Sequence, residues 1–158
     1  MSIAVEYGLH FDLEMILKFD DASWHSGGEF PAGLAADAAA THIGMFVGWC
    51  LLNGLAGELH TVEFSNELKF LQNREATPGA WFLEYCDGKF TDEDVNEEGG
   101  SFTASYYEGE LPEYVTDYEK AVGQGLASLY HVPDTWDSYS ILEPVIASRF
   151  SEWKKKSG

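Results

Sequence analysis

Residues 38–55 read AAATHIGMFVGWCLLNGL, which is the most apolar stretch of the chain and carries no full charge. The apolar side chains between Ile43 and Leu52 cover nearly every direction of a helical wheel, and a helix that is apolar all round is buried in a core or a membrane. Two glycines, an asparagine and a histidine favour a core helix over a membrane span. Gly44 and Gly48 share one helix face, so we expect another backbone segment to lie against it. The stretch therefore predicts a buried central helix.

The composition around this stretch predicts one domain, residues 1–158, because a chain of this length encloses a substantial core. Lysine and arginine number 9 against 27 aspartates and glutamates, which gives a net charge of −18. Nucleic acids and anionic membranes are bound by positive surfaces, so neither is an expected partner. A basic protein is the partner that this charge favours.

The cysteines and the N-terminus indicate a reduced environment. Cys50 lies in the apolar stretch and Cys86 precedes Asp87, and nearby carboxylates raise the pKa of a thiol, so neither is predicted to be a nucleophile. The first residues lack the basic start and apolar segment of a signal peptide. We expect a cytoplasmic protein without disulfides, cofactors or a catalytic residue.

The other segments predict a mainly α-helical fold, a single compact helical domain around the central helix with a small β element near the N-terminus. Alternation over residues 3–9 is typical of a short strand, and the apolar residues 13–19 fit either a strand or a helix. Residues 19–31 contain Gly-Gly and Phe-Pro, which predict an ordered loop. Helices are expected over 65–74, 78–85, 112–122 and 134–153. Thr91 is expected to cap a further helix that begins with three acids.

A polar group precedes and enters the central helix. Asp20, Asp21, Trp24 and His25 lie in the predicted loop, and His42 lies one turn into the helix. One interpretation is a structural network in which a carboxylate accepts a hydrogen bond from the buried imidazole. The alternative is an acid–base or metal-dependent enzyme that uses Asp20, Asp21, His25 and His42. No His-x-His, HExxH or paired Cys-x-x-Cys spacing occurs, so no metal is predicted.

The second half of the chain concentrates its charge. Residues 84–119 contain 12 acids and one base, Lys89, with tyrosines interleaved. Aromatic side chains anchor protein interfaces and carboxylates steer a basic partner, so this segment is a candidate interface; the alternative is a solvated helical face. The predicted partner-binding residues are Asp92, Glu93, Asp94, Glu97, Glu98, Tyr106, Tyr107, Glu108 and Glu110.

Four segments resemble a family of uncharacterised bacterial domains. They read DDASWHSGG at 20–28, ATHIGMF at 40–46, TPGAWFLEYCDGK at 77–89 and TDEDVNEEG at 91–99. The likeness covers most of the chain after residue 19 and brings no activity with it. Such small acidic domains resemble immunity proteins, which are encoded beside interbacterial toxins, and this resemblance implies a binding protein.

The leading hypothesis is therefore a non-enzymatic acidic protein, an immunity protein that neutralises an interbacterial toxin by covering a basic site. The first alternative is the enzyme that uses Asp20, Asp21, His25 and His42. The second alternative is a structural or assembly subunit.

Overall fold

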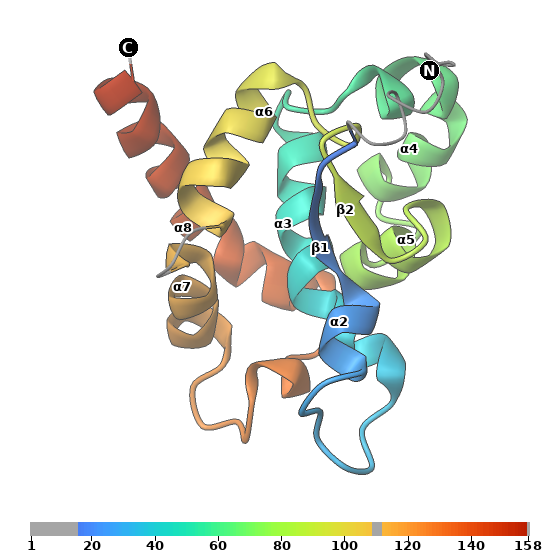
Figure 1. The fold of residues 1–158 in the computed structure, drawn as a ribbon, viewed down its shortest axis with the longest axis vertical. Coiled ribbons are helices and arrows are strands. Elements are labelled where there is room, and N and C mark those ends of the chain that lie inside the picture. The colour runs from blue at the N-terminus through green and yellow to red at the C-terminus, as the bar shows by residue number, and fades with distance from the viewer. Residues whose placement is uncertain (1–15, 109–111, 158) are drawn as a thin grey trace, which may run out of the picture.

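The computed structural model describes residues 16–108 and 112–157, and it is mainly helical with one small sheet (Figure 1). The strand expected over residues 3–9 lies outside the described residues. The α-helices are α2 (Ala22–Ser26), α3 (Thr41–Leu52), α4 (Ser65–Gln72), α5 (Pro78–Tyr85), α6 (Glu97–Phe102), α7 (Glu113–Val122) and α8 (Trp136–Ser157). Short 3-10 turns η1 (Ala36–Ala40) and η4 (Leu129–His131) and π-helical turns η2 (Leu59–Glu63) and η3 (Thr103–Tyr107) connect them.

The central helix is confirmed as α3, although it is shorter than residues 38–55. The residues expected to form the first turn of this helix form the 3-10 turn η1 instead. Helix α3 ends at Asn53 and Gly54, and Gly54 has a left-handed conformation at φ +81°. Residues Thr41–Leu51 are all buried. Figure 1 shows α3 between α5 and β2 on one side and α6, α7 and α8 on the other.

Helix α5 lies directly against the glycine face of α3. A Cβ placed on Gly44 would come within 2.7 Å of the Pro78 carbonyl oxygen and 2.8 Å of the Gly79 Cα. Both contacts are with backbone, which cannot move aside as a flexible side chain can. The predicted close approach at Gly44 is therefore confirmed, and Pro78 occupies the first turn of α5, where a missing N–H costs nothing.

The sheet pairs β1 (Lys18–Asp21) with β2 (Lys89–Thr91) in antiparallel register. The register is irregular between Lys18 and Asp20, and such bulges redirect side chains at a strand. Phe19 packs on Phe90 of β2 with ring centroids 5.0 Å apart. The sheet therefore fixes the position of Asp20 at the edge of the aromatic core.

Two local expectations are wrong because of this pairing. Asp20 and Asp21 end a strand, and α2 follows, where the sequence predicts a loop over residues 19–31. Thr91 ends β2 and does not cap a helix. Helix α6 starts at Glu97, where the Asn96 side chain accepts the Gly99 N–H at 2.8 Å. The predicted small β element is confirmed, but its second strand comes from the middle of the chain.

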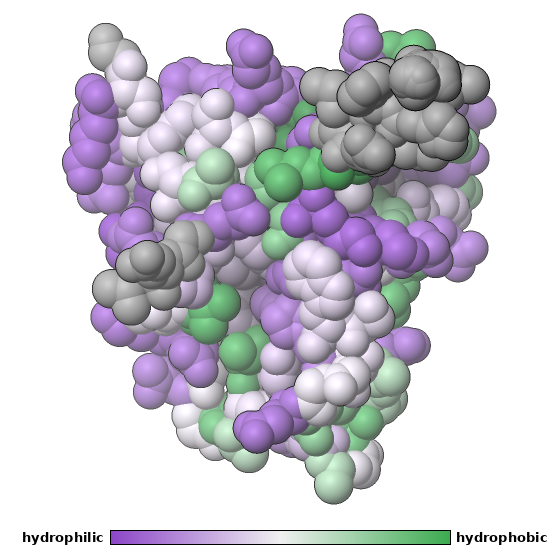
Figure 2. Space-filling view, in the orientation of Figure 1, coloured by the Kyte–Doolittle hydropathy of each residue, from purple (hydrophilic) through white to green (hydrophobic). Residues whose placement is uncertain are grey.

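No helix in residues 16–108 and 112–157 is both long enough and apolar enough to cross a membrane. The face seen in Figure 2 is mostly hydrophilic or neutral, with separate small apolar areas.

Candidate site at Asp20 and the acidic surface

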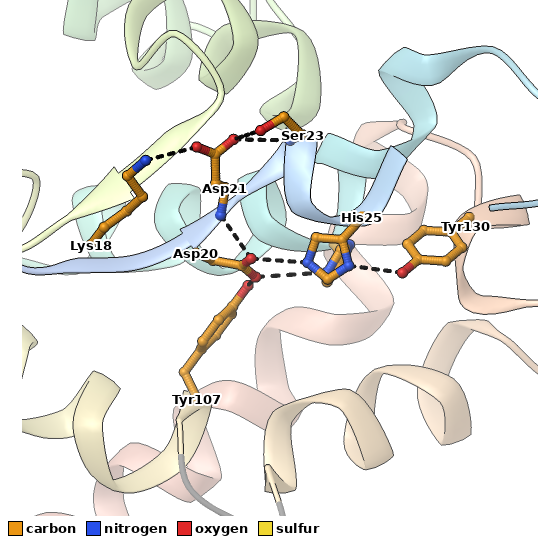
Figure 3. A network of polar contacts seen from close by, with 8 residues as sticks. Lys18, Asp20, Asp21, Ser23, His25, Tyr107 and Tyr130 are labelled. Atoms are coloured by element: carbon orange, nitrogen blue, oxygen red, sulfur yellow. Dashed lines mark hydrogen bonds and ion pairs between the residues drawn. The ribbon is translucent and has the colours of Figure 1, made fainter. Parts of the chain in front are cut away.

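Asp20 is a buried carboxylate that accepts several hydrogen bonds (Figure 3). Its Oδ1 accepts the Asp21 backbone N–H at 2.7 Å and lies 2.9 Å from His25 Nε2. Its Oδ2 accepts the Tyr107 hydroxyl at 2.5 Å. The site therefore joins the consecutive elements β1 and α2 to η3, which lies about 80 residues further along the sequence.

The two histidines of the site differ in their partners. His25 Nδ1 lies 2.8 Å from the Tyr130 hydroxyl of η4, so both of its ring nitrogens are engaged. His42 Nε2 lies 4.0 Å from Asp20 Oδ2, which is beyond hydrogen-bonding distance. His42 Nδ1 is buried without a partner among the described residues. The two rings pack edge to face with centroids 4.6 Å apart.

Burial sets the protonation of the site. Loss of solvent, together with the nearby His25, lowers the pKa of His42 to about 3, against the opposing charge of Asp20. Burial alone raises the pKa of Asp20, but hydrogen bonds from His25 and Tyr107 outweigh it and lower that pKa. Burial and the Asp20 charge raise the pKa of Tyr107 well above its ordinary value. The site near neutral pH therefore holds a carboxylate anion, a neutral His42 and a protonated phenol.

An open hollow of about 340 Å³ adjoins this buried group. The residues that line it are Phe19, Asp20, Trp24, His25, His42, Tyr107, Glu108, Pro112 and Val115. Trp24 lies at the hollow with 56% of its surface exposed. Buried polar groups beside an open, largely apolar hollow form the usual setting of a ligand or metal site.

The structure brings together most of the group predicted at residues 20–42. Asp20, Trp24, His25 and His42 all line the hollow, but Asp21 does not. Asp21 caps α2 by accepting the Ser23 N–H at 2.9 Å and pairs with Lys18 at 2.9 Å. The sequence did not reveal Tyr107 and Tyr130 as partners, because their distance in sequence from Asp20 and His25 leaves no local pattern.

Three of the predicted partner-binding residues are buried and do not belong to a surface. The Tyr106 hydroxyl donates to Asp117 at 2.6 Å, and Tyr107 donates to Asp20. Asp94 accepts the Thr91 N–H at 2.8 Å within the turn after β2. Tyr106, Tyr107 and Asp94 are therefore corrected to interior roles, because each hydroxyl or carboxylate has a buried partner.

The remaining predicted interface residues divide by exposure. Glu93, Glu97 and Glu98 are exposed, Asp92 and Glu108 are half-buried, and Glu110 lies outside the described residues. Glu98 pairs with Lys154 at 3.2 Å. The acidic surface expected from the sequence therefore persists, but with fewer members.

An acidic hollow of about 360 Å³ adjoins these exposed acids. It is lined by Ala56, Gly57, Glu58, Leu59, Glu63, Glu93, Val95 and Asn96. Glu58, Glu63 and Glu93 are exposed and form no ion pair within the part of the chain that the structure describes. Three carboxylates from two distant segments thus share one concave surface. Glu97 follows Asn96, the last lining residue in the sequence.

A second group, which no sequence pattern indicated, consists of the buried His60 and Asp94 and the half-buried Cys86. His60 Nε2 is 2.7 Å from Asp94 Oδ1, and the Cys86 thiol is 3.6 Å from the same oxygen. Burial and the Asp94 charge raise the pKa of Cys86 well above its ordinary value, and burial also raises that of Cys50. Neither thiol is an activated nucleophile, as the sequence predicts. The only sequence signal for the group was one histidine in an apparent connection.

Comparison with known proteins gives one match. The family model described as a domain of unknown function, DUF7832, matches residues 18–132. No curated protein and no solved structure matches the chain.

Proposed function

Because the chain belongs to the DUF7832 family of domains of unknown function, we propose its role from its own surface: it is a non-enzymatic acidic protein that binds a basic protein partner. The proposed class is that of an immunity protein, which neutralises an interbacterial toxin by covering a basic site. It acts in the cytoplasm.

The acidic hollow lined by Glu58, Glu63 and Glu93 is the observation that carries this proposal. A concave surface with carboxylates on its walls concentrates negative potential, because part of the surrounding solvent is replaced by protein. A lysine or arginine side chain of a partner meets three carboxylates there, in place of one on a flat surface. The net charge of −18 adds long-range attraction that speeds the encounter.

The matched test uses two triple variants of equal charge. One variant replaces Glu58, Glu63 and Glu93 with glutamine, and the control replaces the exposed Glu75, Glu84 and Glu119. Where a gene on either side of its own gene encodes a basic protein, that protein serves as the probe. We expect the hollow variant to bind such a product about tenfold more weakly, and the control to bind within about twofold of the wild type, because close opposite charges contribute more than distant ones.

Two measurements extend this test. Co-expression with a toxic neighbouring product is expected to restore growth for the wild type and less well for the hollow variant. Affinity is also expected to fall as salt rises, because screening weakens exposed charge pairs. Equal affinities for the two triple variants, or an affinity independent of salt, would contradict the proposal.

One observation favours a second candidate function, an acid–base or metal-dependent enzyme at Asp20. The unprotonated carboxylate and the neutral His42 face an open hollow beside Trp24 and His25. Neutral imidazole beside a carboxylate is a common arrangement for proton transfer and for metal ligation. A test for hydrolysis of the neighbouring gene product, with His25→Ala as the control, distinguishes this candidate from the binding role.

A further inference from the structure

The Asp20 carboxylate has no lysine or arginine as a counter-ion within the described residues. The nearest lysine in sequence, Lys18, pairs with Asp21. The groups that contact Asp20 are the Asp21 N–H, the Tyr107 hydroxyl and the two imidazoles. A buried carboxylate without a fixed cation is uncommon, because burial of an uncompensated charge is unfavourable. The negative charge of Asp20 is therefore stabilised by hydrogen-bond donors and by imidazoles, whose own charge is not permanent.

His42 has an unmet hydrogen-bonding requirement. Its Nδ1 is buried without a partner among the described residues, and its Nε2 lies 4.0 Å from Asp20 Oδ2, too far for a direct hydrogen bond. Buried polar atoms normally have hydrogen-bond partners, so each exception calls for an explanation. A cation between His42 Nε2 and Asp20 Oδ2 would bind both atoms, and His42 Nδ1 would then carry the ring proton.

We propose that Asp20, His25 and His42 bind one divalent transition-metal ion, with water in its remaining positions toward the hollow. One donor atom from each residue lies within 4.8 Å of the other two. Metal–nitrogen and metal–oxygen bonds of about 2.0–2.2 Å place neighbouring ligand atoms about 3–4 Å apart. His25 Nε2 lies 2.9 Å from Asp20 Oδ1 and His42 Nε2 lies 4.0 Å from Asp20 Oδ2, at the two ends of that range.

The surrounding contacts suit ligation. Coordination through His25 Nε2 requires the ring proton on Nδ1, where the Tyr130 hydroxyl oxygen at 2.8 Å accepts it. The Tyr107 hydroxyl donates to Asp20 and fixes the orientation of that carboxylate. Contacts of this kind orient metal ligands in most known sites. Tyr130 and Tyr107 are therefore positioning residues for the proposed ion.

The ligand types select the class of metal. Two imidazoles with one carboxylate favour zinc and other first-row transition metals, whereas calcium and magnesium prefer sites made of oxygen alone. The group of His60, Cys86 and Asp94 is the competing location. Both groups contain a histidine–aspartate hydrogen bond, His60–Asp94 at 2.7 Å and His25–Asp20 at 2.9 Å, but no residue of the competing group lines one of the hollows described above. It serves as an internal control for the experiment.

The experiment titrates Zn²⁺ into chelator-treated protein in the presence of excess Mg²⁺, which occupies weak acidic sites. We expect one equivalent to bind, with affinity reduced at least about tenfold in His25→Ala and in His42→Ala, since each loses one ligand. The control variants are His131→Ala, which changes a histidine outside the site, and Cys86→Ser, which changes the competing group. Both are expected to bind like the wild type. Loss of binding in Cys86→Ser would place the ion at the other group and overturn the proposal.

A spectroscopic measurement on the unmodified protein keeps the test independent of variant stability. Pulsed electron paramagnetic resonance of the bound Cu²⁺ form counts coordinated imidazoles, and we expect two. Circular dichroism and the melting temperature establish which variants remain folded. A count below two, the absence of stoichiometric Zn²⁺ binding, or unchanged binding in folded His25→Ala and His42→Ala would each overturn the site.

Discussion

Two buried aspartates of this protein accept hydrogen bonds from neighbouring tyrosines, yet their surroundings differ. Tyr106 donates to Asp117 at 2.6 Å, and Tyr107 donates to Asp20 at 2.5 Å. Asp117 also receives two bonds from Arg149, at 2.8 Å from Nε and 3.1 Å from Nη2. Asp20 has imidazoles where Asp117 has a guanidinium. One carboxylate is thus balanced by a permanent cation and the other is not.

The difference teaches how to separate a structural carboxylate from a candidate site. Burial raises the pKa of Asp117, but the hydrogen bonds from Arg149 and Tyr106 outweigh burial and lower that pKa. The Asp117–Arg149 ion pair therefore needs no further ligand. The imidazoles beside Asp20 change charge with pH or with a bound ion. Asp117 therefore belongs to the fold, whereas Asp20 is free to respond to a ligand.

Removal of the guanidinium is the change with the largest expected effect on stability. In Arg149→Met, Asp117 stays buried with Tyr106 as its remaining side-chain donor. Loss of one partner of a buried ion pair costs about 3–5 kcal/mol, and we expect about 2–3 kcal/mol because Arg149 is partly exposed. Urea unfolding measures the loss. A loss below about 0.5 kcal/mol would show that Asp117 does not need its cation.

Acid is expected to destabilise the two aspartate sites in different pH ranges. His42 has a pKa of about 3 in the folded protein, because burial and the neighbouring His25 disfavour its charge against the attraction of Asp20. The unfolded chain takes up this proton near pH 6.5, so the stability of metal-free protein falls as pH drops from there toward 3. The slope for one proton is about 1.4 kcal/mol per pH unit.

Asp117 gives the contrasting range. Its pKa is lowered on folding, so its contribution is complete above about pH 4 and is lost as pH falls through the folded pKa. Unfolding free energies between pH 7 and 4 are expected to show a shallower slope in His42→Gln than in the wild type. The comparison fails if the slope of His42→Gln equals that of the wild type.

Removal of one hydroxyl from each tyrosine compares the aspartates directly. Tyr106→Phe and Tyr107→Phe each leave a buried carboxylate with one fewer donor, at a cost of about 1–3 kcal/mol. We expect the larger loss for Tyr107→Phe, since Asp20 has no guanidinium to compensate. Thermal unfolding of the two variants at one pH gives the order, and the reverse order would mean that Arg149 does not protect Asp117.

The smallest effect is expected from Lys18→Met. Lys18 contacts Asp21 at 2.9 Å with its side chain 36% exposed, and exposed ion pairs contribute about 0–1 kcal/mol. Its removal is expected to change neither stability beyond that range nor the affinity for Zn²⁺. A marked change in Zn²⁺ affinity would make Lys18 a counter-ion of Asp20 after all.

Local patterns in the sequence predicted much of the helical architecture. The all-round apolar character of residues 41–52 and the spacing of Gly44 and Gly48 were sufficient for the central helix and its close neighbour, because both signals are local. The pairing of β1 with β2 was not predictable in this way. Strands of four and three residues have no period, and their partners are about 70 residues apart.

In the candidate site, too, the sequence predicted the residues that are close in the chain and not the contacts between distant segments. Asp20, His25 and His42 are close in the chain and were grouped from the sequence. Tyr106 and Tyr107 were assigned to a surface because they follow an acidic run, but their phenols are interior donors. Asp94 was likewise placed in an acidic helix start, although it turns inward to His60. The composition predicts an acidic surface. Only tertiary contacts show which of the acidic side chains are buried instead of exposed.

The turn η3 ends with Tyr106 and Tyr107, whose hydroxyls reach opposite clusters from adjacent backbone positions. Insertion or deletion of a single residue just before them would rotate both phenols away from both acceptors together. The positions of the two hydroxyls therefore depend on the same short segment of backbone.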